Sequence, residues 1–393
     1  MRNPTFLSLF SGCGGLDYGL MEAGFVPTLA FDHCKYSVDV YNSNFLSNAY
    51  TVDLSRGINL ESLRPDVIVA GPPCQGFSTA GKRGFNDPRN LLLRKTAQIA
   101  LDLRPKVLLV ENVTGALQGR FKPVWNGVEN ELRLAGYRTQ SIVVNASHCG
   151  LSQDRKRVFL IAWLTGAIPR FNFLKKEPVT LFETLDNCDG LSSHSPSTLR
   201  PSARDLAIAR RISPGQSLSN VRGGRNAVHT WEIPEVFGAT TQRERDLLEL
   251  ILKLRRRNRK RNFGDADPLA VEEINAELRH DSTATLLSLR AKGYLRCDEN
   301  ELWDLTRTFN GKYRRLSFDK LSPTVHTKFG DIRYFIHPTN DRGLTPREAA
   351  RIQGFPDNFA FDAPQKEQFR MIGNAVPPSV GKKMAELISR RIL

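Results

Sequence analysis

Strand-like apolar runs alternate with amphipathic helical patterns along the first 165 residues, and this alternation constrains the fold most. The strand-like runs are "TFLSLF", "PTLAFD", "DVIVAG", "KVLLVEN", "RTQSIVVNA" and "RVFLIAWL". The helical patterns between them include "LDYGLMEAGF", "LLLRKTAQIALDL" and "VWNGVENELRLAGY". This order predicts a mostly parallel, doubly wound α/β sheet. Ligands bind such sheets at the carboxyl ends of the strands, so residues that follow a strand are the first site candidates.

The chain changes character twice after this region. Residues 170–240 are rich in Pro, Ser, Gly and Arg and favour a loop-rich binding surface. Residues 242–300 are helical and end in a helix, turn and hairpin order, which resembles a winged helix or else is a purely structural insert. We predict a first domain over 1–168, a second over 169–365, and a C-terminal helix in 366–393 that returns to the first.

The charge of the chain suits a polyanionic partner. Its 393 residues carry a formal net charge of +15. The run "KLRRRNRKR" is so dense in cations that it must be solvated or face phosphate. Candidate phosphate contacts are therefore Arg255, Arg256, Arg257, Arg259 and Lys260. A basic protein without an anionic partner, and a solvated helix face, remain the alternatives.

Neither a membrane span nor a metal is expected. No apolar stretch reaches the roughly 18 to 20 residues that a membrane helix needs, and the opening "MRNPTFLSLFSG" is interpreted as a first strand and not as a signal peptide. We therefore expect a cytoplasmic protein without a membrane partner. The cysteines form no C-x-x-C pair and have no His at zinc-ligand spacing; they are Cys13, Cys34, Cys74, Cys149, Cys188 and Cys297.

The stretch "LSLFSGCGGLDYGL" combines a strand, a glycine-rich turn and a helix. Gly12 and Gly14 would let the backbone approach a ligand closely. Asp32 ends the next strand and could bind a ribose hydroxyl pair, and Asp53 could accept a hydrogen bond from an adenine amino group. The spacing departs from G-x-G-x-x-G, and no G-x-x-x-x-G-K-[ST] is present. The pattern therefore favours S-adenosylmethionine over a dinucleotide or a triphosphate, with a tight structural turn as the alternative.

The stretch "GPPCQGFS" follows another predicted strand and places Cys74 at the same sheet edge. Pro72 and Pro73 stiffen the loop, so the thiol is held toward the predicted pocket. A cysteine is nucleophilic as the thiolate. Most cysteines are small core residues, but the rigid loop and the strand-end position favour a reactive one here.

Two further segments carry candidate catalytic groups. Glu111 ends the strand in "VLLVENV" and could exchange a proton with a bound heterocycle. In "LSQDRKRVFLIAWL", Gln153, Arg155 and Arg157 occupy alternate positions. Alternation predicts one shared face, where both guanidinium groups could converge on one anion or carbonyl, unless the segment is an exposed edge strand.

Taken together, the motifs resemble those of the DNA (cytosine-5)-methyltransferases. The chain carries "FSGCGG", "GPPCQGFS", "ENV", "QDRKR", "REAARIQGFPD" and "GNAVPP" in that family's order, over about residues 5–165 and 341–393. The resemblance implies a mixed doubly wound sheet of the S-adenosylmethionine-dependent type. It also implies that 1–168 is the catalytic and cofactor-binding domain and 169–365 a loop-rich target recognition domain.

The resemblance also implies catalytic roles. Cys74 would add to C6 of a cytosine that is flipped out of duplex DNA, and Glu111 would hold the N3 and N4 edge and protonate N3. Arg157 would contact O2, and Arg155 would hold the adduct or a nearby phosphate. Gln75 and Ser78, close behind the nucleophile, are expected to contact DNA.

Cofactor contacts follow from the resemblance in the same way. Phe10 would pack on the adenine, and Gly12 and Gly14 would line the methionine end. Asp32 would hold the ribose and Asp53 the adenine amino group. The pocket would be completed by Pro73, Asn374 and Val376.

The expected partner is double-stranded DNA, on which the protein would act as a monomer, with a cognate restriction endonuclease as its functional partner. A tRNA cytosine-5 methyltransferase is one alternative, although the long basic recognition segment argues against it. A DNA-binding regulator without catalysis is another, and the intact set of Cys74, Glu111, Arg155 and Arg157 argues against that.

Overall fold

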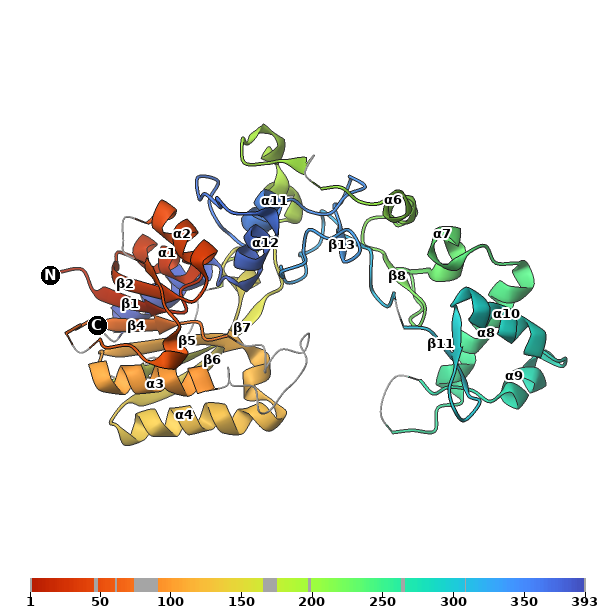
Figure 1. The fold of residues 1–393 in the computed structure, drawn as a ribbon, viewed down its shortest axis with the longest axis horizontal. Coiled ribbons are helices and arrows are strands. Elements are labelled where there is room, and N and C mark those ends of the chain that lie inside the picture. The colour runs from red at the N-terminus through yellow and green to blue at the C-terminus, as the bar shows by residue number, and fades with distance from the viewer. Residues whose placement is uncertain are drawn as a thin grey trace. The chain divides into compact units, whose positions relative to one another are not determined.

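The computed structural model describes residues 2–45, 49–60, 62–73, 91–164, 175–196, 199–262, 266–307 and 309–391 (Figure 1). The chain divides into two compact units. Unit 1 comprises Met1–His194, Leu321–Lys328 and Pro346–Leu393, and unit 2 comprises Ser195–Lys320 and Phe329–Thr345. This division differs from the predicted boundaries, because 175–194, 321–328 and 346–365, which were predicted to belong to the second domain, cluster with unit 1.

Unit 1 is built on a seven-stranded sheet with the order β3-β2-β1-β4-β5-β7-β6. Its strands are β1 (Thr5–Leu9), β2 (Val26–Asp32), β3 (Ala49–Thr51), β4 (Val67–Ala70), β5 (Val107–Val113), β6 (Arg138–Asn145) and β7 (Lys156–Trp163). Its α-helices are α1 (Gly15–Glu22), α2 (Lys35–Asn44), α3 (Leu91–Leu103), α4 (Lys122–Leu134), α5 (Leu181–Leu185), α11 (Pro346–Ile352), α12 (Gln365–Asn374) and α13 (Pro378–Arg391). Only β7 runs antiparallel to its neighbours, β5 and β6, so the predicted mixed doubly wound sheet is confirmed.

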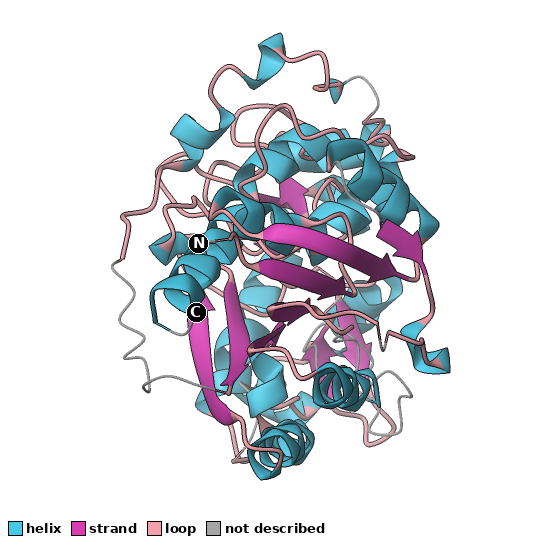
Figure 2. Cartoon of the chain, turned by 90° about the vertical axis from the view of Figure 1, so that its left-hand side faces the viewer, coloured by secondary structure: helices cyan, strands magenta, loops and turns pink. Residues whose placement is uncertain are grey.

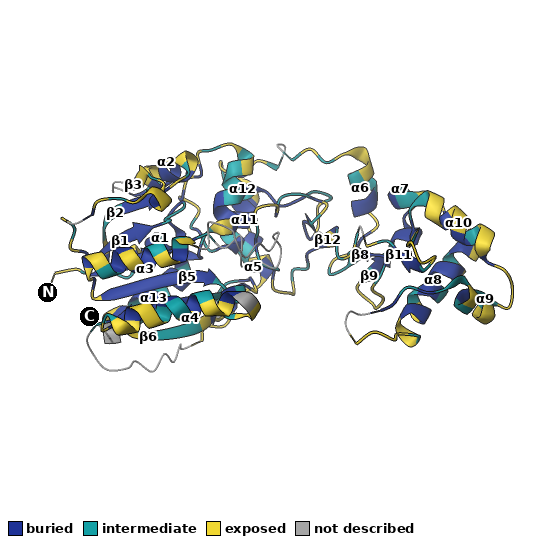
Figure 3. Cartoon of the chain, turned by 60° about the horizontal axis from the view of Figure 1, so that its bottom comes forward, coloured by how far each residue is buried: buried dark blue, intermediate teal, exposed yellow. Residues whose placement is uncertain are grey.

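The sheet of unit 1 is covered on both faces (Figure 2). One apolar cluster joins Leu7, Ile68 and Leu108 to helices α3 and α4. A second joins the alternate positions Phe6, Val67 and Leu109 to α1 and α13. Successive strand residues point to opposite faces, so a central strand covered on both faces must be a continuous apolar run, as β4 is. The neighbouring strand β5 is likewise buried along nearly its whole length (Figure 3).

Helix α13 packs directly on α1, backbone against backbone. A Cβ on Gly19 would lie 2.2 Å from the carbonyl oxygen of Pro378, and one on Gly381 would lie 2.6 Å from that of Leu16. Only glycine permits these approaches. The contact brings the turn before α13 beside the loop that joins β1 to α1.

The described part of unit 2 has two apolar clusters. One joins α6, β8, β9 and α7. The other is formed by the helices α8 to α10 with the strands β10 and β11. Its elements are α6 (Ala203–Ala209), β8 (Ser217–Ser219), β9 (Ala227–His229), α7 (Pro234–Phe237), α8 (Gln242–Arg257), α9 (Val271–Leu278), α10 (Thr283–Lys292), β10 (Leu295–Cys297), β11 (Trp303–Leu305), β12 (Arg314–Arg315) and β13 (Phe335–Ile336). Short 3-10 turns are η1 (Leu54–Arg56), η3 (Thr114–Leu117), η4 (Gly119–Phe121), η5 (Ala146–His148), η6 (Cys188–Gly190) and η8 (Thr230–Glu232). No helix in the described ranges is both long and apolar enough to cross a membrane.

Candidate active site

A pocket of about 200 Å³ lies in unit 1 where the loops after β1, β2, β4 and β5 meet the segment 370–376. It is at the carboxyl ends of parallel strands, where ligands of doubly wound sheets bind. The predicted site residues that line it are Phe10, Gly12, Asp32, Pro73, Glu111, Arg157, Asn374 and Val376. Three segments that are far apart in the sequence therefore meet in one pocket.

Asp32 organises the cofactor side of this pocket. Its carboxylate accepts a hydrogen bond from the Gly12 backbone N–H at 3.0 Å and another from the Cys34 N–H at 2.8 Å. The exposed His33 ring lies beside it, with Nδ1 3.4 Å from Oδ1. A carboxylate has about four acceptor positions, so it can still accept from hydroxyl groups. A Cβ on Gly12 would meet nothing within 4 Å, which leaves open space beside the loop. The remaining carboxylate acceptor positions and the open space fit a nucleoside. Phe10, in the same loop, has a left-handed conformation, with φ of 56°, that residues other than glycine rarely adopt.

Of the described residues predicted to be catalytic or to bind the cofactor, Gly14, Asp53 and Arg155 are not part of the pocket lining. Gly14 has φ of 89°, and a Cβ there would lie 2.4 Å from the Phe45 ring, so glycine is required for packing. Asp53 is half-exposed and caps η1, where Ser55 donates from its backbone N at 3.0 Å and its Oγ at 2.6 Å. These hydrogen bonds lower the pKa of Asp53.

Glu111 and Arg157 form an ion pair in the pocket. Strands β5 and β7 pair antiparallel with Val113 opposite Arg157, so the two side chains come from neighbouring strands. Arg157 Nε lies 3.0 Å from Glu111 Oε1. Burial raises the pKa of Glu111, and the positive charges of Arg157 and Arg155 oppose the rise. A carboxyl group in this state can carry a proton and donate it to a bound base.

The described part of the "GPPC" loop lies beside this pair. The Asn112 side-chain amide donates to the carbonyl oxygen of Pro72 at 3.4 Å, and both Pro72 and Pro73 line the pocket. Cys74, Gln75 and Ser78 lie outside the described residues, so their roles stay predictions. Cys13 also lines the pocket, but burial raises the pKa of its thiol to about 12, which keeps it protonated and unreactive.

Arg155 takes a different place from the expected one. The alternation predicted that Arg155 and Arg157 converge on one anion, but Arg155 is buried and donates to the carbonyl oxygens of Val325 (2.9 Å), Gly373 (3.0 Å) and Ala375 (2.9 Å). Gln153 supports the same junction by accepting from the Val325 N–H at 2.8 Å. Both residues precede or border the start of β7, so strand alternation does not govern their side chains. Arg155 therefore joins backbone segments within unit 1.

Among the Asp, Glu, Lys and Arg side chains that line the pocket, two were not found from the sequence, Asp17 and Arg370. Asp17 is 1% exposed and accepts hydrogen bonds from Ser8 Oγ and the Tyr41 hydroxyl, both at 2.9 Å. Arg370, on α12, bonds Glu367 at 2.5 Å and contacts the Cys34 sulfur. The sequence did contain a sign of Asp17, because its carboxylate stands next to Leu16 and close to Leu20 on the apolar side of the α1 pattern, where a charged residue is unusual. No local signal marked Arg370.

Asp17 gives a pH-dependent prediction. Burial raises its pKa from 3.8 to about 6, so the folded state binds this proton more tightly than the unfolded state. The protonated Asp17 carboxyl group therefore contributes its full share to the free energy of unfolding below pH 3.8. This contribution is lost as the pH rises through 6. We expect the free energy of unfolding of Asp17→Asn, minus that of wild type, to increase by about 2 to 3 kcal/mol from pH 4 to pH 8. Urea denaturation at each pH measures this difference. A difference that stays constant over this range would show that Asp17 titrates normally.

The basic run predicted to contact phosphate is partly used inside unit 2. Arg255 is 2% exposed and forms an ion pair with Asp304, so it is not available to a phosphate. Arg257 bonds Glu277 at 2.6 Å. Arg256, Arg259 and Lys260 have exposed or half-exposed side chains, and they keep their place as candidate phosphate contacts.

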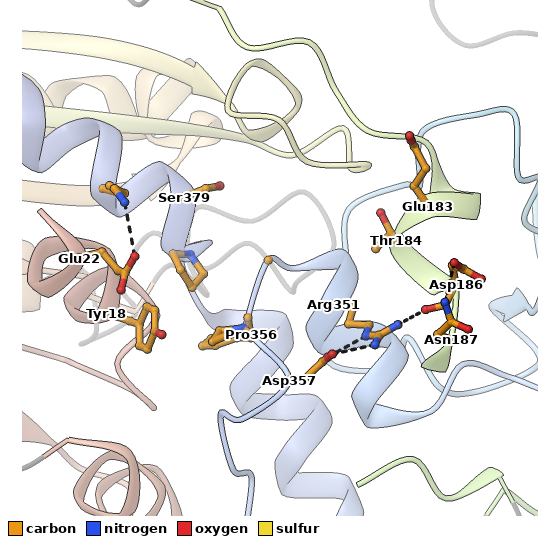
Figure 4. Close-up of a pocket in the computed structure, with 14 residues that line it drawn as sticks. Tyr18, Glu22, Glu183, Thr184, Asp186, Asn187, Arg351, Pro356, Asp357 and Ser379 are labelled. Carbon is orange, nitrogen blue, oxygen red and sulfur yellow. Dashed lines mark hydrogen bonds and ion pairs between the residues drawn. The ribbon is translucent and has the colours of Figure 1, made fainter. Parts of the chain in front are cut away.

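A second pocket of unit 1, of about 700 Å³, lies among α1, α5, α11 and the start of α13 (Figure 4). Its charged groups are largely paired with one another. Arg351 bonds both Asp357 oxygens at 2.7 Å and the carbonyl oxygen of Asp186 at 2.5 Å, and Lys382 lies 3.4 Å from Glu22. None of the site residues predicted from the sequence lines it, so it is not the candidate active site. Within the described ranges, no cluster of three His, Cys, Asp or Glu could hold a metal ion.

The fold and the first pocket define an α/β protein with a nucleoside-type site and a paired acid and guanidinium. Comparison with known proteins agrees: the sequence model of the C-5 cytosine-specific DNA methylases matches residues 4–390. The chain belongs to this family, whose members use S-adenosylmethionine as methyl donor. The family and the enzyme class predicted from the motifs, a DNA (cytosine-5)-methyltransferase, are thereby confirmed.

Relatives match over nearly the whole chain. Type II methyltransferase M.NlaIV of Neisseria lactamica is 29% identical over 98% of this chain and 99% of its own. Type II methyltransferase M.BanI of Aneurinibacillus aneurinilyticus is 28% identical over 97% of this chain and 94% of its own. Among solved structures, a candidate DNA modification methyltransferase encoded within an E. coli prophage is 26% identical, with a TM-score of 0.59 over 99% of both chains. The methyltransferase EhMeth of Entamoeba histolytica has a TM-score of 0.62 over 99% of both chains at 16% identity, and shows the fold alone.

Proposed function

We propose that this enzyme methylates C5 of a cytosine that is flipped out of a specific double-stranded DNA sequence. The observation that carries the proposal is the Glu111–Arg157 pair, with 3.0 Å between Nε and Oε1, in a pocket that the glycine-rich loop also lines. Cytosine presents an acceptor at O2 and a polar edge at N3 and N4. A guanidinium and a carboxyl group that can carry a proton are complementary to these atoms.

Cys74 is the proposed nucleophile. Its thiolate forms a bond from sulfur to C6 while Glu111 protonates N3, so the electron pair of the C5–C6 bond becomes available at C5. Bound S-adenosylmethionine supplies an electrophilic methyl group on a sulfonium. After methyl transfer, a water molecule takes the C5 proton, and its loss drives cleavage of the bond between C6 and sulfur. N3 returns its proton to Glu111, so the aromatic ring, the thiolate and the carboxyl group are all restored.

The same pocket is proposed to hold the cofactor. Asp32 keeps acceptor capacity for the ribose hydroxyl groups, and the open space beside Gly12 accommodates the methionine end. Phe10, Pro73, Asn374 and Val376 line the same cavity and would pack around the nucleoside. Asp53 is proposed to bind the adenine amino group through its half-exposed carboxylate, although it does not line the pocket itself.

Unit 2 is proposed as the target recognition domain. Its sequence lies where none of the six shared motifs occurs, so it is free to determine which bases are read. We further propose that methylation protects cellular DNA from a cognate restriction endonuclease, and that the protein acts as a cytoplasmic monomer. The names of the curated relatives, type II methyltransferases, support the protective role.

Bisulfite sequencing tests this function. The protein is incubated with S-adenosylmethionine and, separately, with plasmid DNA and tRNA, and methylated cytosines are then mapped. Methylation of one short DNA sequence is the expected result. Product in tRNA alone would replace the proposed substrate, and no product in either would remove the proposed activity.

Glu111→Gln should lower the rate of methyl transfer by about 10²- to 10⁴-fold, because the amide cannot donate a proton to N3 as a carboxyl group can. Single-turnover methylation of the mapped duplex measures this rate. Calorimetry should show unchanged S-adenosylmethionine affinity, which separates a lost proton from a damaged pocket. A rate close to that of wild type would take Glu111 out of the mechanism.

A further inference from the structure

Residues 242–305 of unit 2 form a winged-helix module, a name used here for that segment. Helix α8 is followed by Leu269, which exchanges backbone hydrogen bonds with Trp303 at 2.9 and 2.8 Å. Helices α9 and α10 then lead into the antiparallel hairpin β10–β11 (Figure 1). Three helices and three short antiparallel segments in this order are the winged-helix arrangement, in which the helix before the hairpin can enter a DNA groove.

The module has its own apolar core, so its outward faces can be identified. The cluster contains Leu247, Leu248, Ile251, Leu254, Leu269, Ile274, Leu286, Leu289, Tyr294, Leu295, Trp303 and Leu305. Helix α10 contributes Leu286 and Leu289 to it, and both are fully buried. The opposite side of α10 is exposed and consists of Thr283, Ala284, Leu287, Arg290 and Ala291, which we call the α10 face (Figure 3).

Six of the cations in residues 242–307 form ion pairs within this segment, namely Arg255, Arg257, Arg261, Lys292, Arg296 and Arg307. Residues 242–307 hold 14 Lys and Arg against 13 Asp and Glu. Arg255 and Arg296 pair with Asp304, and Lys292 lies 2.7 Å from Glu244. Eight described cations of the module have no ion-pair partner: Arg243, Arg245, Lys253, Arg256, Arg259, Lys260, Arg279 and Arg290. Arg290 belongs to the α10 face, and Arg279 precedes α10. Two available cations therefore lie on or next to the α10 face.

The chemistry of the α10 face suits the major groove. Helix α10 carries no carboxylate between Thr283 and Lys292, so phosphates do not repel it. Its small side chains let the helix approach base edges, the methyl groups of Thr, Ala and Leu suit the methyl group of thymine, and Arg suits guanine. Leu287 is 52% exposed and offers an apolar side chain that can contact the methyl group of thymine. The hairpin tip is acidic, with Asp298, Glu299 and Glu301, and is not suited to phosphate.

We propose that α10 is a DNA-reading helix that enters the major groove and contacts base pairs which the catalytic pocket does not contact. This inference rests on the proposed function, in which duplex DNA is the substrate. It deepens that function, because it assigns sequence reading within unit 2 to the α10 face and not to the hairpin tip or the basic run at the end of α8.

The test uses the full-length protein and the duplex identified by bisulfite sequencing. Leu287→Glu places a carboxylate on the α10 face, and Leu134→Glu is the matched control, because Leu134 is a 90% exposed leucine on α4 of unit 1. We expect Leu287→Glu to weaken duplex binding, measured by fluorescence anisotropy, by at least tenfold. Leu134→Glu should leave it unchanged, and thermal unfolding should show both variants folded.

Arg290→Ala provides an independent readout. It should lower the slope of log affinity against log salt by about one if Arg290 contacts phosphate, or relax the methylated sequence at one position if it contacts a base. Wild-type affinity, salt slope and methylated sequence in both Leu287→Glu and Arg290→Ala would overturn the inference and leave the module as structural support. Absence of DNA methylation by the wild type would instead contradict the proposed function, so the two failures are distinguishable.

Discussion

Cys74→Ser should abolish methyl transfer while leaving DNA and S-adenosylmethionine binding intact. A serine hydroxyl does not ionise near neutral pH, so no strong nucleophile would remain to add to C6. Without that addition C5 of cytosine stays aromatic and does not attack the methyl group. The described neighbours of Cys74 are Pro72 and Pro73, which line the same pocket as Glu111 and Arg157.

Two measurements complete this test. A duplex with fluorine at C5 of the target cytosine has no C5 proton to lose, so wild type should remain covalently bound to it and migrate as a denaturant-stable complex. Cys74→Ser should form no such complex, and Cys13→Ser should form it normally, because burial keeps the Cys13 thiol protonated. Methyl transfer by Cys74→Ser would contradict a covalent mechanism.

Arg155→Met should prevent stable folding of unit 1. The three carbonyl groups that accept hydrogen bonds from Arg155 belong to Val325, Gly373 and Ala375, and methionine would leave them unsatisfied. At about 1 to 3 kcal/mol for each buried unsatisfied group, the loss is roughly 3 to 9 kcal/mol. That is comparable to the roughly 5 to 15 kcal/mol by which a domain is stable.

Thermal unfolding and solubility measure this effect, and nearby substitutions provide controls. Lys156→Met changes an exposed neighbour and should alter stability by less than about 0.5 kcal/mol. Arg155→Lys keeps one cation but cannot reproduce the forked geometry, so it should recover only part of the loss. If Arg155→Met were as stable as wild type and only its catalytic rate fell, Arg155 would be a catalytic group after all.

The predicted fold and most of the predicted pocket depended on local patterns. The apolar run of β4 and the helical pattern of α3 are set by residues close together in the chain, so the α/β class was readable from them. Glu111 and Asp32 follow strands, and parallel strands bring their carboxyl ends to one edge regardless of the rest of the molecule. The hydrogen bonds of Arg155 could not be predicted from the sequence, because its partners lie 170 to 220 positions away.

The basic run at the end of α8 shows the same limit. Its composition predicted phosphate contact for every member, yet Arg255 faces Asp304 in the core of the winged-helix module. A run of basic residues in the sequence shows how many cations are present. Tertiary packing determines which of them form an ion pair with a carboxylate. For the same reason, the sequence could not indicate that Arg279 and Arg290, among the many arginines of unit 2, have no ion-pair partner within the described residues.

The sequence alone determined the sheet, the strand-end acids, the family and the identity of the proposed nucleophile, because each depends on residues that are neighbours in the chain or on ordered motifs. The tertiary structure alone decided that α13 packs on α1, that Arg155 joins three distant carbonyl groups, and that α10 exposes a face without carboxylates. These features depend on contacts between segments whose approach is governed by core packing, and packing depends on the shape of many residues at once.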